Sequence, residues 1–309
     1  YNHQAPEEYV PSVLPLLKDT DDGVRAMAVQ FISNHRRYIK ELIPLCKDES
    51  GAVRAVAVRA INWACAGEFA GEALRCLDDP VAGVRSEAVQ ALHQLHEIKH
   101  ADKIVEHLKD EDPKTRINVA AMVIGLKITK HMDLAAKLLE DPEAQVRERV
   151  AHLLGSFSNA KYAPEVEKLL KDKNVEVRRT AVSALSRMKA KEALPSVLSV
   201  LQDEDAFVRL EAIRFIGEYG SKDSAPAVLK LLKDETSMVR QTAVSALLKM
   251  KAKEALPSVL SVLHDEDGRV CLEALCFIEE FGSKDDVPAV SKLLNDGDLK
   301  IREKAAAVV

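Results

Sequence analysis

The segment His96–His100, with the sequence HEIKH, has the residue types of a zinc site. Two histidines four residues apart share one face of an α-helix, where their imidazoles can bind zinc while the glutamate between them acts as a base. This chemistry requires an unbroken helix. Aligned with the rest of the chain, the segment matches 189–193, where one helix ends and a turn begins. We therefore predict no metal site here, with adventitious metal binding by His93, His96 and His100 as the alternative.

No other residue pattern points to catalysis. The sequence has no glycine-rich phosphate loop and no recognisable Ser/His/Asp or Cys/His grouping, so we predict no catalytic residue and no cofactor. The five cysteines are scattered and odd in number, which favours reduced thiols and a cytoplasmic location. The net charge of −5 argues against nucleic acid as a partner. No apolar run approaches the roughly 20 residues that span a bilayer, so we predict no membrane span. We also expect no small-molecule ligand.

The helices of this chain can be predicted from a repeated pattern, Asp-x5-Arg. Its arginines are spaced 29 residues apart at the first step and 31 thereafter, and a tenth copy has Cys271 in place of arginine. A fixed period of this length indicates a solenoid of stacked repeats. The nine complete pairs are Asp19 and Arg25, Asp48 and Arg54, Asp79 and Arg85, Asp110 and Arg116, Asp141 and Arg147, Asp172 and Arg178, Asp203 and Arg209, Asp234 and Arg240, and Asp296 and Arg302.

Two helices are predicted in each repeat. The second helix contains the arginine, and its apolar residues recur at one helical face, with a valine before most arginines and an Ala-Val pair three residues after them. Residues that favour helix N-caps precede this helix, and Asp79-Pro80 and Asp141-Pro142 predict a cap followed by a first-turn proline. The first helix carries a proline in its first turn in six repeats, at Pro11, Pro164, Pro195, Pro226, Pro257 and Pro288.

The pattern resembles HEAT repeats, and more closely the short HEAT-like repeats named after phycobilisome lyases. The residues that carry the resemblance are the Asp-x5-Arg pair, the preceding valine, the Ala-Val step and the first-turn proline. It implies an all-α fold, a right-handed superhelical α-solenoid of about ten two-helix repeats. It also implies a ladder of Asp–Arg contacts between successive repeats and a concave face lined by the second helices. We expect residues 1–309 to form one continuous array that is part of a longer chain.

The face of the second helices opposite the apolar stripe is the predicted binding surface. A single tryptophan beside an arginine on this face has the composition of an interaction hot spot, although Trp63 filling a gap against Phe69 is the alternative. The equivalent residues 180–187 and 242–249 belong to a duplicated segment, in which 23 of 26 residues match, and predict a less distinctive surface. The residues predicted to contact a partner are Met27, Gln30, Asn34, Arg59, Asn62, Trp63, Gln90 and Gln94.

These observations favour a non-enzymatic scaffold that binds a protein or peptide on its concave surface. The resemblance leaves open an accessory, chaperone-like or bilin lyase-like protein, and the sensor or spacer arm of a larger signalling protein is a further alternative. The basic segment His35–Lys40 predicts either a solvated turn or a site for an anionic partner. We expect weaker joints at the shortened first turn and near Cys271, where a rung of the ladder is missing.

Overall fold

The structure, a computed structural model, describes residues 7–309, which contain twenty α-helices and no β-strand. A short helix is followed by a long one ten times, so the predicted all-α solenoid of two-helix repeats is confirmed. No helix in this range is both long and apolar enough to cross a membrane. The chain divides into two compact units, one ending at Phe157 and the other running from Ser158 to Val309, and each is described by itself.

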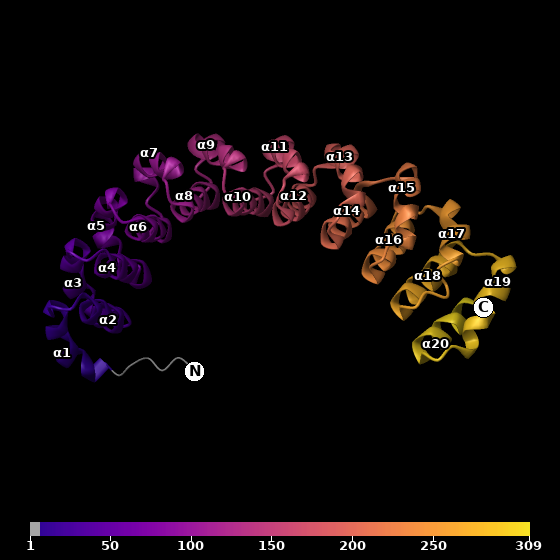
Figure 1. Cartoon of the computed structure of the whole chain (residues 1–309), viewed down its shortest axis with the longest axis horizontal. Coiled ribbons are helices and arrows are strands. Elements are labelled where there is room, and N and C mark those ends of the chain that lie inside the picture. Colours follow the sequence, from indigo (N-terminus) through magenta and orange to yellow (C-terminus); the bar gives the residue numbers. More distant parts are fainter. Residues whose placement is uncertain (1–6) are drawn as a thin grey trace. The chain divides into compact units, whose positions relative to one another are not determined.

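In the first unit, the long helices lie side by side on the inner side of the unit's curve, and the short helices cover their outer side (Figure 1). The long helices are α2 (Asp22–Ser33), α4 (Gly51–Ala64), α6 (Ala82–Gln94), α8 (Pro113–Gly125) and α10 (Ala144–Ser156). The short helices are α1 (Val10–Val13), α3 (Ile39–Leu42), α5 (Ala70–Arg75), α7 (Ala101–Ile104) and α9 (Met132–Ala136).

The second unit repeats the same two layers (Figure 1). Its long helices are α12 (Val175–Met188), α14 (Ala206–Tyr219), α16 (Ser237–Lys249), α18 (Gly268–Phe281) and α20 (Leu299–Val308). Its short helices are α11 (Ala163–Lys168), α13 (Leu194–Ser199), α15 (Ala225–Leu229), α17 (Leu256–Leu260) and α19 (Val287–Ser291). In both units, we call the face of the long helices that is turned away from the short helices the long-helix surface.

The short helices begin as their prolines predict but are not long α-helices. In α13, Pro195 lies in the first turn, where its missing N–H is not needed. A 3₁₀ turn over Lys191–Ala193 precedes this helix, and a second over Val200–Gln202 follows it. The α-helical part therefore spans six residues, and most short helices are extended by such tighter turns.

The core lies between the two layers and between neighbouring repeats. In α4, Val53, Ala57, Val58 and Ile61 are fully buried, and they lie at the apolar positions that the periodicity predicts. Burying each valine or isoleucine side chain contributes about 1.5–3 kcal/mol to stability. Since a single helix pair cannot cover these residues, each repeat depends on its neighbours.

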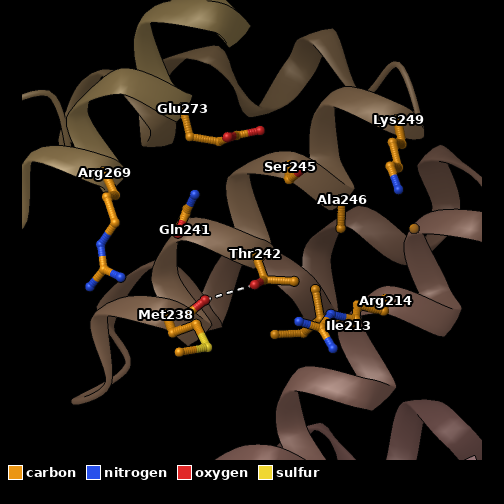
Figure 2. A pocket seen from close by; sticks show the side chains of 11 residues that line it. Ile213, Arg214, Met238, Gln241, Thr242, Ser245, Ala246, Lys249, Arg269 and Glu273 are labelled. Atoms are coloured by element: carbon orange, nitrogen blue, oxygen red, sulfur yellow. Dashed lines mark hydrogen bonds between the residues drawn. The ribbon is translucent and has the colours of Figure 1, made fainter. Parts of the chain in front are cut away.

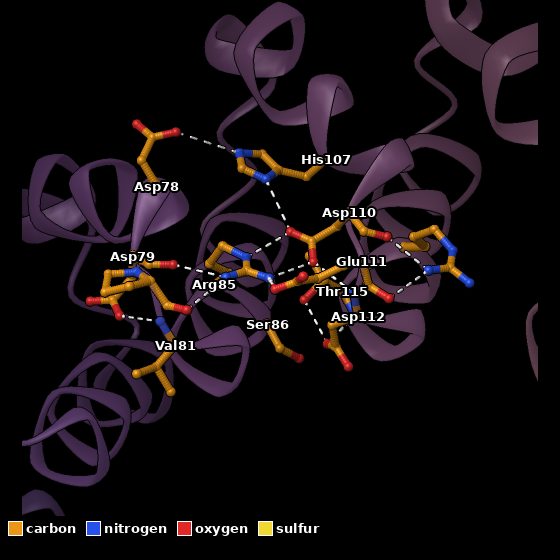
Figure 3. Close-up of polar contacts among 12 residues, drawn as sticks. Asp78, Asp79, Val81, Arg85, Ser86, His107, Asp110, Glu111, Asp112 and Thr115 are labelled. Atoms are coloured by element: carbon orange, nitrogen blue, oxygen red, sulfur yellow. Dashed lines mark hydrogen bonds and ion pairs between the residues drawn. The ribbon is translucent and has the colours of Figure 1, made fainter.

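The Asp-x5-Arg residues join successive repeats. The guanidinium of Arg85 in α6 donates from Nε and Nη2 to the two carboxylate oxygens of Asp110, both at 2.7 Å, and from Nη1 to the carbonyl oxygen of Asp79 at 2.9 Å (Figure 3). Burial alone would raise the pKa of the Asp110 carboxyl, but the hydrogen bonds from Arg85 and the backbone N–H of Asp112 outweigh it and hold the pKa below its ordinary value. Each rung therefore links an arginine to its own repeat and to the next.

Each ladder aspartate also positions the start of its long helix. One carboxylate oxygen accepts the backbone N–H two residues later, and that residue is the helix N-cap; for Asp79 the donor is Val81, at 2.9 Å (Figure 3). The predicted caps at Asp79-Pro80 and Asp141-Pro142 are therefore wrong. The helices α6 and α10 begin two residues later than the Pro, with Val81 and Glu143 as N-caps, because the aspartate side chain is engaged with the arginine and with this N–H.

Cys271 keeps the contact that a ladder arginine makes within its own repeat. Its Sγ lies 3.2 Å from the carbonyl oxygen of Asp265, the equivalent of the carbonyl that arginine contacts in other repeats. The ion pair to the following repeat is lost: Asp296 accepts the N–H of Asp298 at 2.8 Å and has no ion-pair partner among the residues described. The joint between α18 and α20 therefore lacks one inter-repeat contact.

Candidate functional site

The predicted partner-binding residues lie on α2, α4 and α6 or directly after α2, on the long-helix surface of the first unit. Met27 is 72% exposed in α2 and Trp63 is 56% exposed in the last turn of α4. Such exposure is too large for an indole that fills a core gap against Phe69. The tryptophan side chain is therefore available to a ligand, and a large aromatic side chain can act as the apolar anchor of an interface.

Arg59 is held by a neighbouring helix. Its Nη2 donates to Oε1 of Glu87 at 2.9 Å, which joins α4 to α6. The sequence pattern places Glu87 on the exposed face, but the residue is only 6% exposed, because it lies where the two long helices pack together. This acid–base pair fixes the guanidinium next to the turn of helix that carries Trp63.

The amide side chains among the predicted partner-binding residues differ in their contacts. Gln94 donates from Nε2 to Sγ of Cys65 at 3.9 Å, and Asn34 donates from Nδ2 to the carbonyl oxygen of Gln30 at 3.4 Å. In residues 7–309, the side-chain amides of Asn62 and Gln90 form no hydrogen bond with the protein. Free amides on the helices that line this surface can pair with the backbone of a bound polypeptide.

His93, in α6, packs against the next long helix. Its Nε2 would lie 3.3 Å from a Cβ at position 125, so the glycine of α8 makes room for the imidazole. Burial lowers the pKa of His93, and the charge of the nearby His96 lowers it further. The imidazole is therefore neutral near pH 7 and packs between α6 and α8.

The structure does not form a zinc site at His96–His100. Helix α6 ends at Gln94, and His96 has a positive φ of 55°, so the two histidines of the motif do not share a helical face. The Nδ1 atom of His96 lies 3.0 Å from the carbonyl oxygen of Gln94. No group of three metal-binding side chains occurs in the described part of the chain.

The repeats match a known family. A model described as HEAT repeats matches residues 10–93, 39–125, 132–210 and 194–277, which together cover most of the chain. The chain belongs to the HEAT-repeat family. The resemblance to the subtype named after phycobilisome lyases stays a prediction. No curated protein matches this HEAT-repeat chain in sequence.

Two solved structures show the same fold at low sequence identity. An engineered protein is 19% identical, with a TM-score of 0.60 over 97% of both chains. A chain in the structure of Kap95p with RanGDP is 13% identical, with a TM-score of 0.68 over 97% of the HEAT-repeat chain and 49% of its own length. At these identities the likeness concerns the fold alone.

The basic segment His35–Lys40 is partly engaged. Arg37 pairs with Glu7 at 2.5 Å and donates to the hydroxyl of Tyr38 at 2.6 Å. Arg36 and Lys40 line a cleft of about 340 Å³ that also contains the acidic side chain of Glu68. With Arg37, the cleft contains three cations and one carboxylate, and a site for an anionic partner stays a prediction.

Sequence reasoning missed a groove in the second unit. The surface around Thr242, Ser245 and Lys249 is predicted to be undistinguished, yet these residues line a groove of about 390 Å³ (Figure 2). The signal for the groove is Gly217, which has no side chain where the preceding repeat has Ser186. The residues that contact Gly217 belong to the next repeat. The groove that this glycine helps to form therefore depends on packing between repeats, which the sequence pattern of a single helix does not reveal.

Proposed function

We propose that this HEAT-repeat chain is a non-catalytic scaffold that binds a protein partner on the long-helix surface of its first unit. The observation that carries the proposal is the exposed indole of Trp63 in α4, the helix that also contains the fixed Arg59 and the free amide of Asn62, with the free amide of Gln90 on the neighbouring α6. Aromatic and arginine side chains dominate the binding energy of protein interfaces.

The comparisons support a protein ligand in a general sense. Kap95p, in one of the similar structures, binds RanGDP, so a fold of this kind is compatible with a protein partner. Repeats that present successive long helices on one side supply an extended surface for such a partner. The five free cysteines fit a reducing compartment, so we propose a cytoplasmic location.

The test is affinity capture with the purified chain, compared with the Trp63→Ala variant and read by mass spectrometry. The matched control is Phe207→Ala, because Phe207 is 54% exposed on α14 and its truncation removes a similar apolar area from the other unit. A partner retained by the unchanged protein and by Phe207→Ala, but lost by Trp63→Ala, supports the proposal. A partner retained equally by all three proteins contradicts the assignment of the site.

Arg59 is not suitable for this test. Its removal leaves the buried carboxylate of Glu87 without its partner, and the resulting loss of stability would be confused with a loss of binding. Trp63 is more than half exposed, so its truncation leaves the core intact.

A further inference from the structure

A groove runs along α16 between α14 and α18 (Figure 2). We call it the α16 groove; its floor extends from Met238 to Lys249, a length of roughly 16 Å at 1.5 Å per helical residue. An extended polypeptide of about five residues has this length. The α16 groove therefore has the dimensions of a site for a peptide segment.

A row of polar side chains follows the floor of the groove. Gln241, Ser245 and Lys249 are spaced four residues apart, so they lie one above the other on the same face of α16. Among the residues the structure describes, none of these three side chains forms a hydrogen bond or an ion pair with the protein. The nearby Thr242 differs, because its hydroxyl donates to the carbonyl oxygen of Met238 at 2.7 Å (Figure 2). The row thus presents an amide, a hydroxyl and an ammonium group to a ligand.

The depth of the groove at its Lys249 end depends on Gly217. A Cβ at this position would lie 3.1 Å from Cα and Cβ of Ala246, and 3.8 Å from Cδ of Lys249. The absence of a side chain lets α14 and α16 approach closely. The aliphatic part of Lys249 passes over the glycine, and its ammonium group lies at the groove (Figure 2).

The cations of the groove differ in their partners, and among the residues described Lys249 has no ion-pair partner and is available to an acidic ligand. Three cations, Arg214, Lys249 and Arg269, line the groove against one carboxylate, Glu273. Arg269 is engaged by Asp267 through two contacts, at 3.0 and 2.6 Å. Arg214 uses Nη1 to contact Glu211 at 2.7 Å, which leaves its other N–H groups for a ligand. Lys249 and Arg214 are therefore the cations most available to a carboxylate.

We propose that the α16 groove binds an extended polypeptide segment with an acidic side chain, whose carboxylate lies between Lys249 and Arg214. The amide of Gln241 can then donate to and accept from the peptide backbone, and the hydroxyl of Ser245 lies between these contacts. Glu273 faces the groove from α18 and disfavours a continuous polyanion such as a nucleic acid. The inference rests on the proposed function in that both ligands are polypeptides, but it concerns a separate surface.

The test uses the full chain and three immobilised heptapeptide libraries whose central residue is fixed as glutamate, glutamine or lysine. We expect about tenfold more protein to be retained on the glutamate library than on the glutamine library, the change expected from one hydrogen-bonded charge pair. Lys249→Glu removes this preference and shifts retention toward the lysine library. The matched control, Lys233→Glu, makes the same charge change on the exposed short-helix layer and leaves the preference unchanged.

Three results would overturn the proposal. They are equal retention on the glutamate and glutamine libraries, a preference that survives Lys249→Glu, and an equal loss of preference in Lys233→Glu. Circular dichroism verifies that each variant is folded. Trp63→Ala is measured in the same assay: an unchanged glutamate preference supports a site in the second unit, whereas its loss places the acidic segment on the first unit. Failure of the groove proposal is thereby distinguished from failure of the proposed function.

Discussion

The guanidinium of Arg59 lies 2.9 Å from the carboxylate of Glu87, and the two residues belong to the neighbouring long helices α4 and α6. Glu87 is buried while Arg59 is partly exposed. The pair therefore holds two repeats together at the surface that we propose for the partner, beside the exposed Trp63.

We expect Arg59→Ala to lower the free energy of unfolding by about 1–2 kcal/mol, because it leaves a buried carboxylate unpaired while solvent at the exposed guanidinium limits the loss. Urea denaturation measures the change. The double variant Arg59→Ala/Glu87→Gln should recover part of the stability, since the unpaired charge is removed. A double variant that is less stable than Arg59→Ala would show that the pair is not the cause.

The incomplete rung at Cys271 can be restored. In Cys271→Arg, the guanidinium reaches the carbonyl of Asp265 and the carboxylate of Asp296, as arginines do in other repeats. We expect about 1–3 kcal/mol of added stability from the charged hydrogen bonds. Hydrogen exchange should slow in α18 and α20 in this variant, whereas Cys271→Ser should not slow it. Faster exchange in Cys271→Arg would contradict the assignment of this rung.

The stability of the first unit should fall as the pH drops below about 6.5, the ordinary pKa of histidine. Burial lowers the pKa of His93 in the folded state, so the unfolded chain binds a proton at a higher pH than the folded chain does. Above the pKa of His93 in the unfolded chain, the imidazole is neutral in both states and does not change the free energy of unfolding. As the pH falls toward the lower pKa of His93 in the folded state, the imidazole is protonated in the unfolded chain first, and this lowers the free energy of unfolding.

The measurement is urea unfolding at pH 7.5 and pH 5.5. His93→Gln should reduce the difference between the two values, while His264→Gln, at an exposed position, should not. If His93→Gln leaves the pH dependence unchanged, the buried imidazole is not its source.

Zinc should leave the thermal midpoint unchanged, because the histidines of the HEIKH segment do not share a helical face. A metal that binds the folded chain specifically would raise the midpoint as its concentration increases. Thermal unfolding with and without equimolar zinc tests this expectation. A saturable rise that His96→Gln abolishes would demonstrate a zinc site.

The fold could be predicted because the same short pattern recurs. Each Asp-x5-Arg copy marks a long helix, and the buried valines and alanines around it follow the helical period. The helix starts after Asp79 and Asp141 were predicted wrongly because local cap rules ignore the arginine that engages each aspartate. The side chain of Asp79 accepts from Arg54 of the preceding repeat, and its carbonyl oxygen accepts from Arg85, six positions later.

The surface could be predicted less well, because it depends on contacts between repeats. The helical pattern assigns Glu87 to the exposed face, but packing of α4 against α6 buries it. Gly217 looks unremarkable in sequence, yet its contact with Ala246 shapes the α16 groove. The exposure of Trp63 likewise depends on its position in the last turn of α4, where neighbouring residues leave more than half of the side chain uncovered.

The central claim is that a protein partner contacts Trp63, and the chain offers a direct probe because it contains one tryptophan. The chain labelled with 5-fluorotryptophan should give a single ¹⁹F resonance. Titration with the captured partner should shift or broaden this resonance with the same concentration dependence as binding measured by fluorescence anisotropy. A partner that binds while the resonance stays unchanged would show that the binding surface lies elsewhere on the chain.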